Sequence, residues 1–175
     1  MQKILRTTGL IGALLCLPSV ALAQSDTGTL TVTATVESSI ALTFENASGG
    51  VTLSGATTDT ATMAFGNVSA YGTITTAGVT RTAGATNFTV SSPFAVKVVL
   101  ANGSSADYTL QAALTSADTT NTWEVNSTTL TTTDQTLGSS YAYGSALPHT
   151  LSLTVPFSAT ASSVSNVVTF TATPN

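Results

Sequence analysis

The chain contains a single cysteine, Cys16, which lies in the apolar stretch near the N-terminus. With no cysteine pair there is no intramolecular disulfide framework, so the fold must depend on an ordinary hydrophobic core. Leu14 and Leu15 precede Cys16, whereas a lipoprotein signal requires a small residue directly before the cysteine. We therefore expect neither disulfides nor a lipid anchor.

Charged residues are also scarce and make up 7% of the chain, against roughly 25% in ordinary soluble domains. Four residues are Lys or Arg, eight are Asp or Glu, and the formal net charge is −4. Binding of nucleic acid or anionic lipid depends on clustered basic residues, which this composition lacks. Weak charge also means that little electrostatic repulsion opposes self-association.

Residues suited to acid–base or metal chemistry are few. The one histidine, His149, follows Pro148 and is predicted to be a surface or turn residue, and no serine lies in a Gly-x-Ser-x-Gly elbow. Zinc lacks ligands, and the acidic residues form no alternating calcium loop. Asp118 and Asp134 lie in polar stretches, where they could join a calcium site or cap backbone amides. We predict a non-enzymatic protein without metal or cofactor.

The N-terminus has the pattern of a secretory signal peptide. Lys3 and Arg6 supply a positive region, residues 10–17 are apolar, and Ala21-Leu22-Ala23 provides small residues for cleavage. We predict residues 1–23 as the signal peptide and residues 24–175 as the mature protein. The apolar run is shorter than the roughly 20 residues of a membrane-spanning helix, so no transmembrane anchor is expected in the mature chain. The predicted location is secreted: periplasm, cell surface or extracellular.

Alternation of polar and apolar residues dominates the rest of the chain. Residues 29–36 read Thr-Leu-Thr-Val-Thr-Ala-Thr-Val, which places Leu30, Val32, Ala34 and Val36 on one face and four threonines on the other. An extended strand separates alternate residues in this way, and Thr and Val favour it. Further strands are predicted at residues 40–44, 51–53, 60–68, 72–76, 87–91, 94–101, 108–114, 122–125, 151–157 and 167–173.

Short strands at this spacing, with no helical periodicity after the signal, predict an all-β fold. We expect a single antiparallel β-sandwich domain over residues 24–175, either Ig-like, pilin-like or a jelly roll. Asn102-Gly103 is the strongest hairpin signal in the chain. Residues 94–100, apolar except for Lys97, are predicted to form a central strand. The Thr/Ser/Gly-rich residues 128–143 are predicted to form a long loop or an irregular edge.

Aromatic residues make up only 6% of the chain, and a carbohydrate-binding protein would need some of them exposed as stacking platforms. Tyr141 and Tyr143 alternate and could share an exposed face, so they are the preferred glycan-contact candidates. Trp123 is a further candidate, although a single tryptophan in a β protein is more often part of the core.

Several short motifs follow one another in an order that resembles secreted bacterial surface proteins. They are Phe65-Gly66-Asn67-Val68, Gly72-Thr73-Ile74-Thr75, Asn102-Gly103, Tyr108-Thr109-Leu110 and Val168-Thr169-Phe170-Thr171-Ala172. Together with the alternating strand after the signal, this layout resembles pilin-type sandwiches, especially the spore coat U-like group and related proteins of unnamed function. The chain departs from them in lacking the cysteine pair common in those pilins and in ending on Pro174-Asn175.

This resemblance implies assembly by donor-strand exchange, in which an extended N-terminal segment completes the sheet of a neighbouring subunit. Leu30, Val32, Ala34 and Val36 would then be the subunit contacts. The alternative is that residues 29–36 form the first strand of their own sandwich. We expect a structural or adhesive surface protein, as a fibre subunit, whose partner is another copy or another surface protein. The alternative function is a sandwich that binds a carbohydrate or another ligand.

Overall fold

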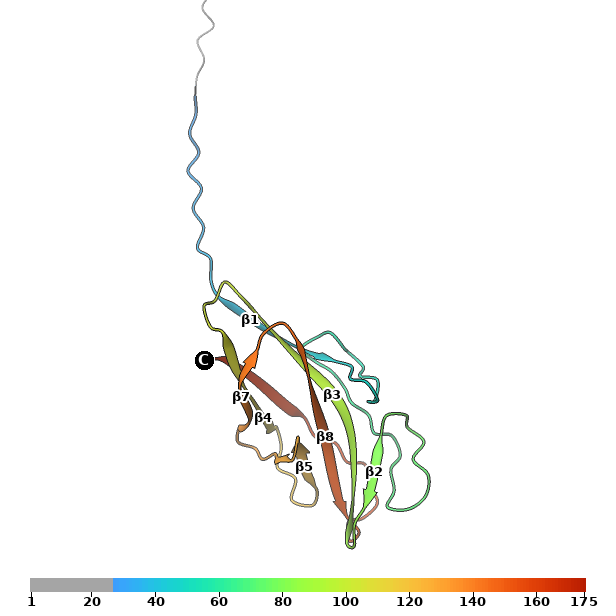
Figure 1. Ribbon diagram of the computed structural model, residues 1–175. Helices are drawn as coiled ribbons and strands as arrows, with labels where there is room; N and C mark the ends of the chain where they lie inside the picture. The colour runs from blue at the N-terminus through green and yellow to red at the C-terminus, as the bar shows by residue number, and fades with distance from the viewer. Residues whose placement is uncertain (1–26) are drawn as a thin grey trace, which may run out of the picture. The chain divides into compact units, whose positions relative to one another are not determined.

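The computed structural model describes residues 27–175, in which all regular structure is β-strand (Figure 1). The chain divides into two units, residues 1–35 and residues 36–175, each of which is described by itself. The predicted signal peptide lies outside the described residues. Within residues 27–175, no helix is long and apolar enough to cross a bilayer.

Nine strands occur within residues 36–175 and confirm the predicted β-sandwich. Their bounds are β1 (Ser39–Glu45), β2 (Thr80–Ala83), β3 (Asn87–Ala101), β4 (Asp107–Leu114), β5 (Thr122–Val125), β6 (Thr128–Thr129), β7 (Gln135–Ala142), β8 (Ala146–Pro156) and β9 (Val168–Pro174). They form two antiparallel sheets packed against each other.

The larger sheet has the strand order β1-β3-β8-β5-β6, and the smaller sheet has the order β7-β4-β9. β3 is 15 residues long, so one of its edges pairs with β2 through Phe88–Ser91 and then with β1 through Ala95–Ala101. Its other edge pairs with β8. The predicted central strand is therefore confirmed, and β1 and β9 are edge strands of opposite sheets.

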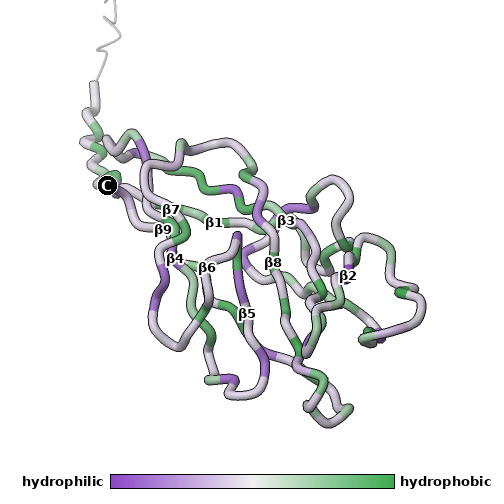
Figure 2. Tube along the Cα trace, turned by 60° about the horizontal axis from the view of Figure 1, so that its bottom comes forward, coloured by the Kyte–Doolittle hydropathy of each residue, from purple (hydrophilic) through white to green (hydrophobic). Residues whose placement is uncertain are grey.

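The core lies between the sheets and takes alternate residues from each of them. On β3, the buried inward residues are Phe88, Val90, Ser92, Phe94, Val96 and Val98. From the smaller sheet, Tyr108, Leu110 and Ala112 of β4 have no exposed surface. Figure 2 shows few strongly hydrophilic positions along the chain, because threonine and serine rather than charged residues provide most of its polarity.

Residues 46–79 contain none of the three strands predicted there, at 51–53, 60–68 and 72–76. Ser54 and Thr62 form one isolated bridge. Val51 and Leu53 are nonetheless buried, and the Val51 amide donates a hydrogen bond to Ser92 Oγ at 2.8 Å. Several residues with left-handed φ interrupt the extended backbone here, among them Gly55 (83°) and Gly72 (98°). The apolar residues of this region thus cover the core without joining a ladder.

Residues 128–143, predicted to form a long loop or an irregular edge, contain β6 and the edge strand β7 of the smaller sheet. β7 pairs with β4 through an irregular register, with shifts between Tyr108 and Gln111 of β4. Gly138 leaves room for the Tyr141 ring, since a Cβ there would lie 2.5 Å from its hydroxyl and the ring would have to shift. A ladder with a bulge tolerates glycine and serine that simple alternation would exclude.

The predicted hairpin at Asn102-Gly103 is also wrong. Asn102 has the left-handed φ of 57° that such a turn requires. However, β3 before it belongs to the larger sheet and β4 after it to the smaller one. The dipeptide therefore carries the chain from one sheet to the other, a distinction that local turn chemistry does not contain.

Candidate functional site

Residues 27–38 carry the most regular strand pattern in the chain but form no strand. The exposed fraction is 88% for Leu30, 81% for Val32 and 72% for Val36, and Ala34 is exposed as well. Apolar surface gains about 25 cal/mol for each Å² removed from water. The four predicted subunit-contact residues therefore leave apolar surface in water, and residues 29–36 form no strand in this structure.

β1 offers part of an open sheet edge. Its outward-directed backbone groups belong to alternate residues, which in an antiparallel strand point away from the β3 ladder. At Phe44 these groups are occupied, because its amide donates to the Thr58 carbonyl at 2.8 Å and its carbonyl accepts from Thr57 at 2.7 Å. No such backbone partner is found for Ile40 and Leu42 among residues 27–175.

β9 offers a second open edge, in the smaller sheet. The carbonyl of Val167 accepts from the Thr115 amide at 2.8 Å, so odd-numbered residues of this strand face β4. By alternation, Val168, Phe170 and Ala172 direct their backbone groups away from β4. The Phe170 ring contacts the Phe44 ring of β1, with centroids 5.4 Å apart. The two open edges therefore lie on the same side of the sandwich, and we call the space between them the β1–β9 seam.

The β1–β9 seam is apolar along its length and hollow at one end. Leu42, Phe44, Phe170 and Ala172 are half-buried against the core, while Ile40 is 37% exposed. At the hollow end, a pocket of about 460 Å³ is lined by Ser38, Leu100, Asn102, Gly103, Ser104, Ser105, Pro174 and Asn175. Because Ser38 lies near Pro174 and Phe44 meets Phe170, the two edge strands run antiparallel across the seam.

The residues of the β1–β9 seam were not predicted from the sequence to form a site. Ile40, Leu42, Val168, Phe170 and Ala172 were expected in strands, but nothing in their local pattern marks an edge position. Pairing between strands distant in sequence decides which strand has a free side. The one local signal of unusual strands was the regular alternation of polar and apolar residues in residues 29–36 and 168–173.

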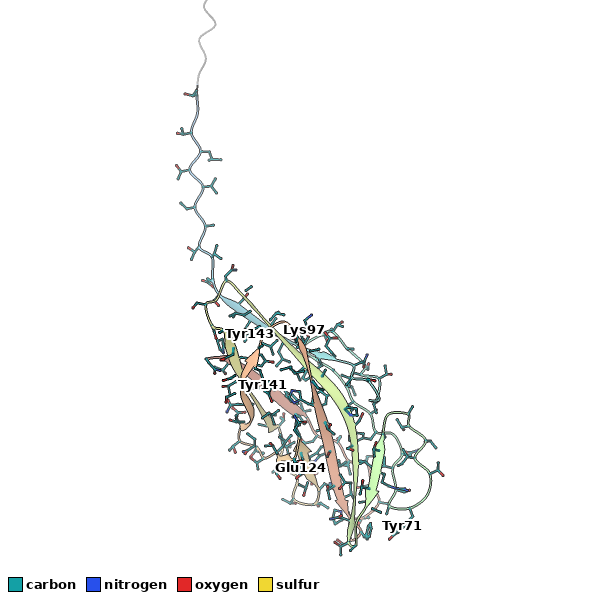
Figure 3. The ribbon with its side chains drawn as sticks, viewed as in Figure 1. Tyr71, Lys97, Glu124, Tyr141 and Tyr143 are labelled. Atoms are coloured by element: carbon teal, nitrogen blue, oxygen red, sulfur yellow. The ribbon has the colours of Figure 1, made fainter. Side chains whose placement is uncertain are left out.

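Tyr141 and Tyr143, the preferred glycan-contact candidates, are half-buried and do not form the expected exposed face. Their rings pack against Tyr108, with centroids 5.7 and 5.1 Å away. The Tyr141 hydroxyl donates to the Leu137 carbonyl at 3.2 Å, and that of Tyr143 to the Asp107 carbonyl at 3.0 Å. Figure 3 shows the two side chains close together beside β7. The absence of a side chain at Gly138 allows the Tyr141 ring to lie over the strand.

Trp123 is 6% exposed, and its ring belongs to the core rather than to a surface platform. Its Nε1 donates to Asp118 Oδ2 at 2.8 Å, while Asp118 Oδ1 accepts from the amides of Thr120 at 3.0 Å and Asn121 at 2.9 Å. Burial by itself raises the pKa of Asp118, but hydrogen bonds from Asn121, Trp123 and Thr120 outweigh it and lower the pKa to about 2. Asp118 thus caps a turn, and residues 27–175 hold no cluster of three or more His, Cys, Asp or Glu.

His149 is 3% exposed, so the prediction of a surface histidine is wrong. Asn126 Oδ1 accepts from the Thr150 amide at 2.8 Å, which orients Asn126 Nδ2 to donate to His149 Nδ1, also at 2.8 Å. The rings of Phe94 and Tyr141 pack on the imidazole, with centroids 5.8 and 6.0 Å away. His149 Nε2 has no hydrogen-bond partner in the described chain, and burial lowers the pKa of the imidazole. Neutral His149 therefore helps to hold β8 to the Asn126 turn.

Comparison with known proteins reveals no relative: no family model, curated protein or solved structure matches this chain.

Proposed function

We propose that this protein is a non-enzymatic structural or adhesive subunit that assembles outside the cytoplasm by donating residues 29–36 to a second copy. The observation that carries this proposal is the exposure of a strand-forming segment whose Leu30 and Val32 have 88% and 81% of their surface in water. The same chain has an apolar seam with two open edges, which is the kind of site that accepts an added strand.

The chemistry of the segment suits the β1–β9 seam. A strand placed there would supply backbone partners to Ile40 and Leu42 on one side and to the outward residues of β9 on the other. Because β1 and β9 run antiparallel, it would lie parallel to one edge and antiparallel to the other. Its apolar row would cover Phe44 and Phe170, and its threonines would remain in water. Full burial of each large apolar side chain contributes about 1.5–3 kcal/mol.

The electrostatics of the segment do not oppose assembly. Residues 27–36 contain no charged side chain, and the whole chain carries a net charge of only −4. Copies can therefore approach closely with little repulsion at ordinary ionic strength. Binding of a carbohydrate or another ligand through Tyr141, Tyr143 and Trp123, the alternative predicted from the sequence, has less support because those rings are buried or half-buried.

The test is the size of the natively secreted protein, by gel filtration and negative-stain microscopy, beside a variant lacking residues 24–36. We expect multimers or filaments from the natural chain and a folded monomer from the variant. A finer pair compares Leu30→Asp/Val32→Asp with Thr31→Asp/Thr33→Asp, which places the same two charges on the opposite face. The first pair should abolish assembly, and the second should weaken it much less.

A second arm locates the acceptor. Ile40→Asp places a charge in the seam and should also give a monomer. Its mixture with Leu30→Asp/Val32→Asp should give a dimer, because the first variant keeps an intact donor segment and the second keeps an intact seam. A natural chain that stays monomeric at high concentration contradicts the proposal. A variant lacking residues 24–36 that fails to fold would make the segment an ordinary part of its own sandwich.

A further inference from the structure

Two aromatic side chains of residues 27–175 are exposed, and they lie against each other. Tyr71 is 73% exposed and Phe157 is 37% exposed, whereas the other Phe, Tyr and Trp residues are buried or half-buried. Their ring centroids are 5.7 Å apart, and Phe157 in turn stacks on buried Phe88 at 6.5 Å and 18°. We call these three rings the Tyr71 platform. Rings from three parts of the chain thus form one aromatic cluster, in which Tyr71 and Phe157 are exposed and Phe88 supports them from the core.

Hydrogen bonds hold the Tyr71 platform in place. Arg81 of β2 donates from Nη1 to the Ser69 carbonyl at 3.0 Å, and the Ser69 hydroxyl donates to the Tyr71 carbonyl. The Phe157 amide donates to the Thr86 carbonyl at 2.8 Å. Because the backbone beside both exposed rings is fixed, little conformational entropy would be lost when a ligand binds to them.

The segments that build this surface carry one positive charge, that of Arg81, and no carboxylate; Lys97 lies toward the opposite end of β3, where it pairs with Thr43. Between Asp59 and Asp107 the charged residues are Arg81 and Lys97, and no Asp or Glu follows Asp134. The guanidinium of Arg81 has five N–H donors in a rigid fork, and its bond to Ser69 uses one Nη1 donor. In a chain with a net charge of −4, a cation bonded to the backbone two residues before Tyr71 is suited to an anionic ligand.

We propose that the Tyr71 platform binds an acidic polysaccharide, with a uronic-acid ring as the unit recognised. A pyranose ring has a face of C–H groups that can lie on Tyr71 and Phe157. The hydroxyls around its rim can form hydrogen bonds with protein hydroxyls beside the two rings. Its carboxylate would accept hydrogen bonds from Arg81, which forms charge-assisted pairs with this group. An aromatic floor with a few directed polar groups is the usual composition of a small-molecule site.

This site is distinct from the assembly site. Phe88 lies near the start of β3, and β1 begins at the opposite end of that strand, where Ser39 pairs with Ala101. β3 has 15 residues, which at roughly 3.3 Å each span about 50 Å. Figure 3 places Tyr71 at the end of the sandwich opposite Tyr143. One copy can therefore use both sites, and neither proposal depends on the other.

The experiment screens the full secreted chain on a microarray of uronic-acid polysaccharides, each printed beside the neutral polymer with the same linkage. Calorimetry with oligosaccharides of the bound pair then measures affinity. We expect Tyr71→Ala to weaken binding at least about tenfold and Tyr71→Trp to retain it. Arg81→Lys keeps the charge without the fork and should retain part of the affinity that Arg81→Gln loses. Val99→Ala, an exposed β3 position outside the platform, should bind as the natural chain does.

The urea midpoint of each variant distinguishes lost contacts from lost folding, and exposed Tyr71→Ala should leave it nearly unchanged. Several outcomes overturn the proposal: no binding to any printed polysaccharide, equal binding to acidic and neutral polymers, or unchanged binding by Tyr71→Ala. A change in oligomeric size on Tyr71→Ala, without a change in glycan binding, would instead make the platform a contact between copies.

Discussion

Two segments near opposite ends of the chain have almost the same sequence pattern and different structures. Residues 29–36 read Thr-Leu-Thr-Val-Thr-Ala-Thr-Val, and β9 reads Val-Thr-Phe-Thr-Ala-Thr-Pro. β9 pairs with β4 from Val168 to Pro174, and its apolar residues up to Ala172 are half-buried. In the N-terminal segment no ladder forms, and Leu30 is 88% exposed.

The difference teaches that alternation specifies which face of a strand can be buried but not whether a partner covers it. Phe170 in β9 reaches across the seam to Phe44 and also contacts Phe94, with ring centroids 5.4 and 5.7 Å apart. The N-terminal segment contains no aromatic residue of this kind. β9 is therefore part of the core, whereas residues 29–36 keep their capacity for pairing unused within the chain.

The largest expected difference between the two segments comes from proline. Thr171→Pro removes an amide that faces β4 and leaves the opposing carbonyl unpaired, so it should lower the free energy of unfolding by about 3 kcal/mol, the upper end of the cost of an unpaired backbone group. The matched change Thr33→Pro lies in the unpaired segment and should leave that free energy unchanged, since no ladder is lost. Urea denaturation followed by tryptophan fluorescence measures both.

The same pair of proline variants tests assembly. If residues 29–36 pair as a strand in a second copy, Thr33→Pro should reduce the multimers seen by gel filtration without unfolding the sandwich. Equal destabilisation by both variants would mean that the N-terminal segment is already paired within its own chain, and the contrast with β9 would disappear.

Removal of side chains should give a smaller difference of the same sign. Phe170→Ala leaves a cavity beside Phe44 and Phe94, and we expect the free energy of unfolding to fall by about 2–3 kcal/mol, less than for a fully buried ring. Val32→Ala should change it by less than about 0.5 kcal/mol, as exposed positions do. Thermal and urea unfolding measure both changes. The variant lacking residues 24–36 is the reference, because there only the change in β9 can alter the free energy of unfolding.

The smallest expected effect is on pH dependence, and it should belong to the sandwich alone. Burial lowers the pKa of His149 in the folded chain, so the unfolded chain takes up the proton first. Stability is then complete above about pH 6.5 and decreases as the pH falls, by at most about 1.4 kcal/mol per pH unit. Protonation of Nδ1 would also remove the acceptor for Asn126.

This pH effect is measured as the urea midpoint at pH 8, 6.5 and 5. His149→Gln should flatten the dependence in that range. A variant lacking residues 27–36 should retain it, because the segment contains no titratable side chain. Loss of the dependence in the truncated variant would show that the segment contacts the His149 region.

Prediction from sequence succeeded where the pattern of residues within one strand shows which side chains are buried. The alternation in residues 40–44, 108–114 and 167–173 identified β1, β4 and β9, and the apolar run around Lys97 identified the central strand β3. Prediction failed where pairing with a strand distant in sequence decides whether a segment joins a sheet. Residues 60–68 alternate over much of their length, yet left-handed residues and the core-covering position of Val51 and Leu53 leave that region without a ladder. β7 formed despite Gly138 because its bulge against β4 accepts that residue.

Of the candidate assembly site, the sequence predicted the donor segment but not the seam that accepts it. Leu30, Val32, Ala34 and Val36 could be named in advance because a single strand face contains them all. The β1–β9 seam and the Tyr71 platform could not, because each joins residues far apart in the sequence. Likewise, the half-burial of Tyr141 and Tyr143 depends on packing against Tyr108, which their own alternation does not reveal.

Residue types and their order along the chain predict an all-β chain with low charge, an alternating core and a strand-forming segment near its N-terminus. These properties follow from side-chain type and a period of two, which operate over a few residues. Tertiary structure alone decided which edges stay open, where His149 is buried and which aromatic rings face water. Those outcomes depend on how two sheets meet, and the contacts between them join residues that no local pattern relates.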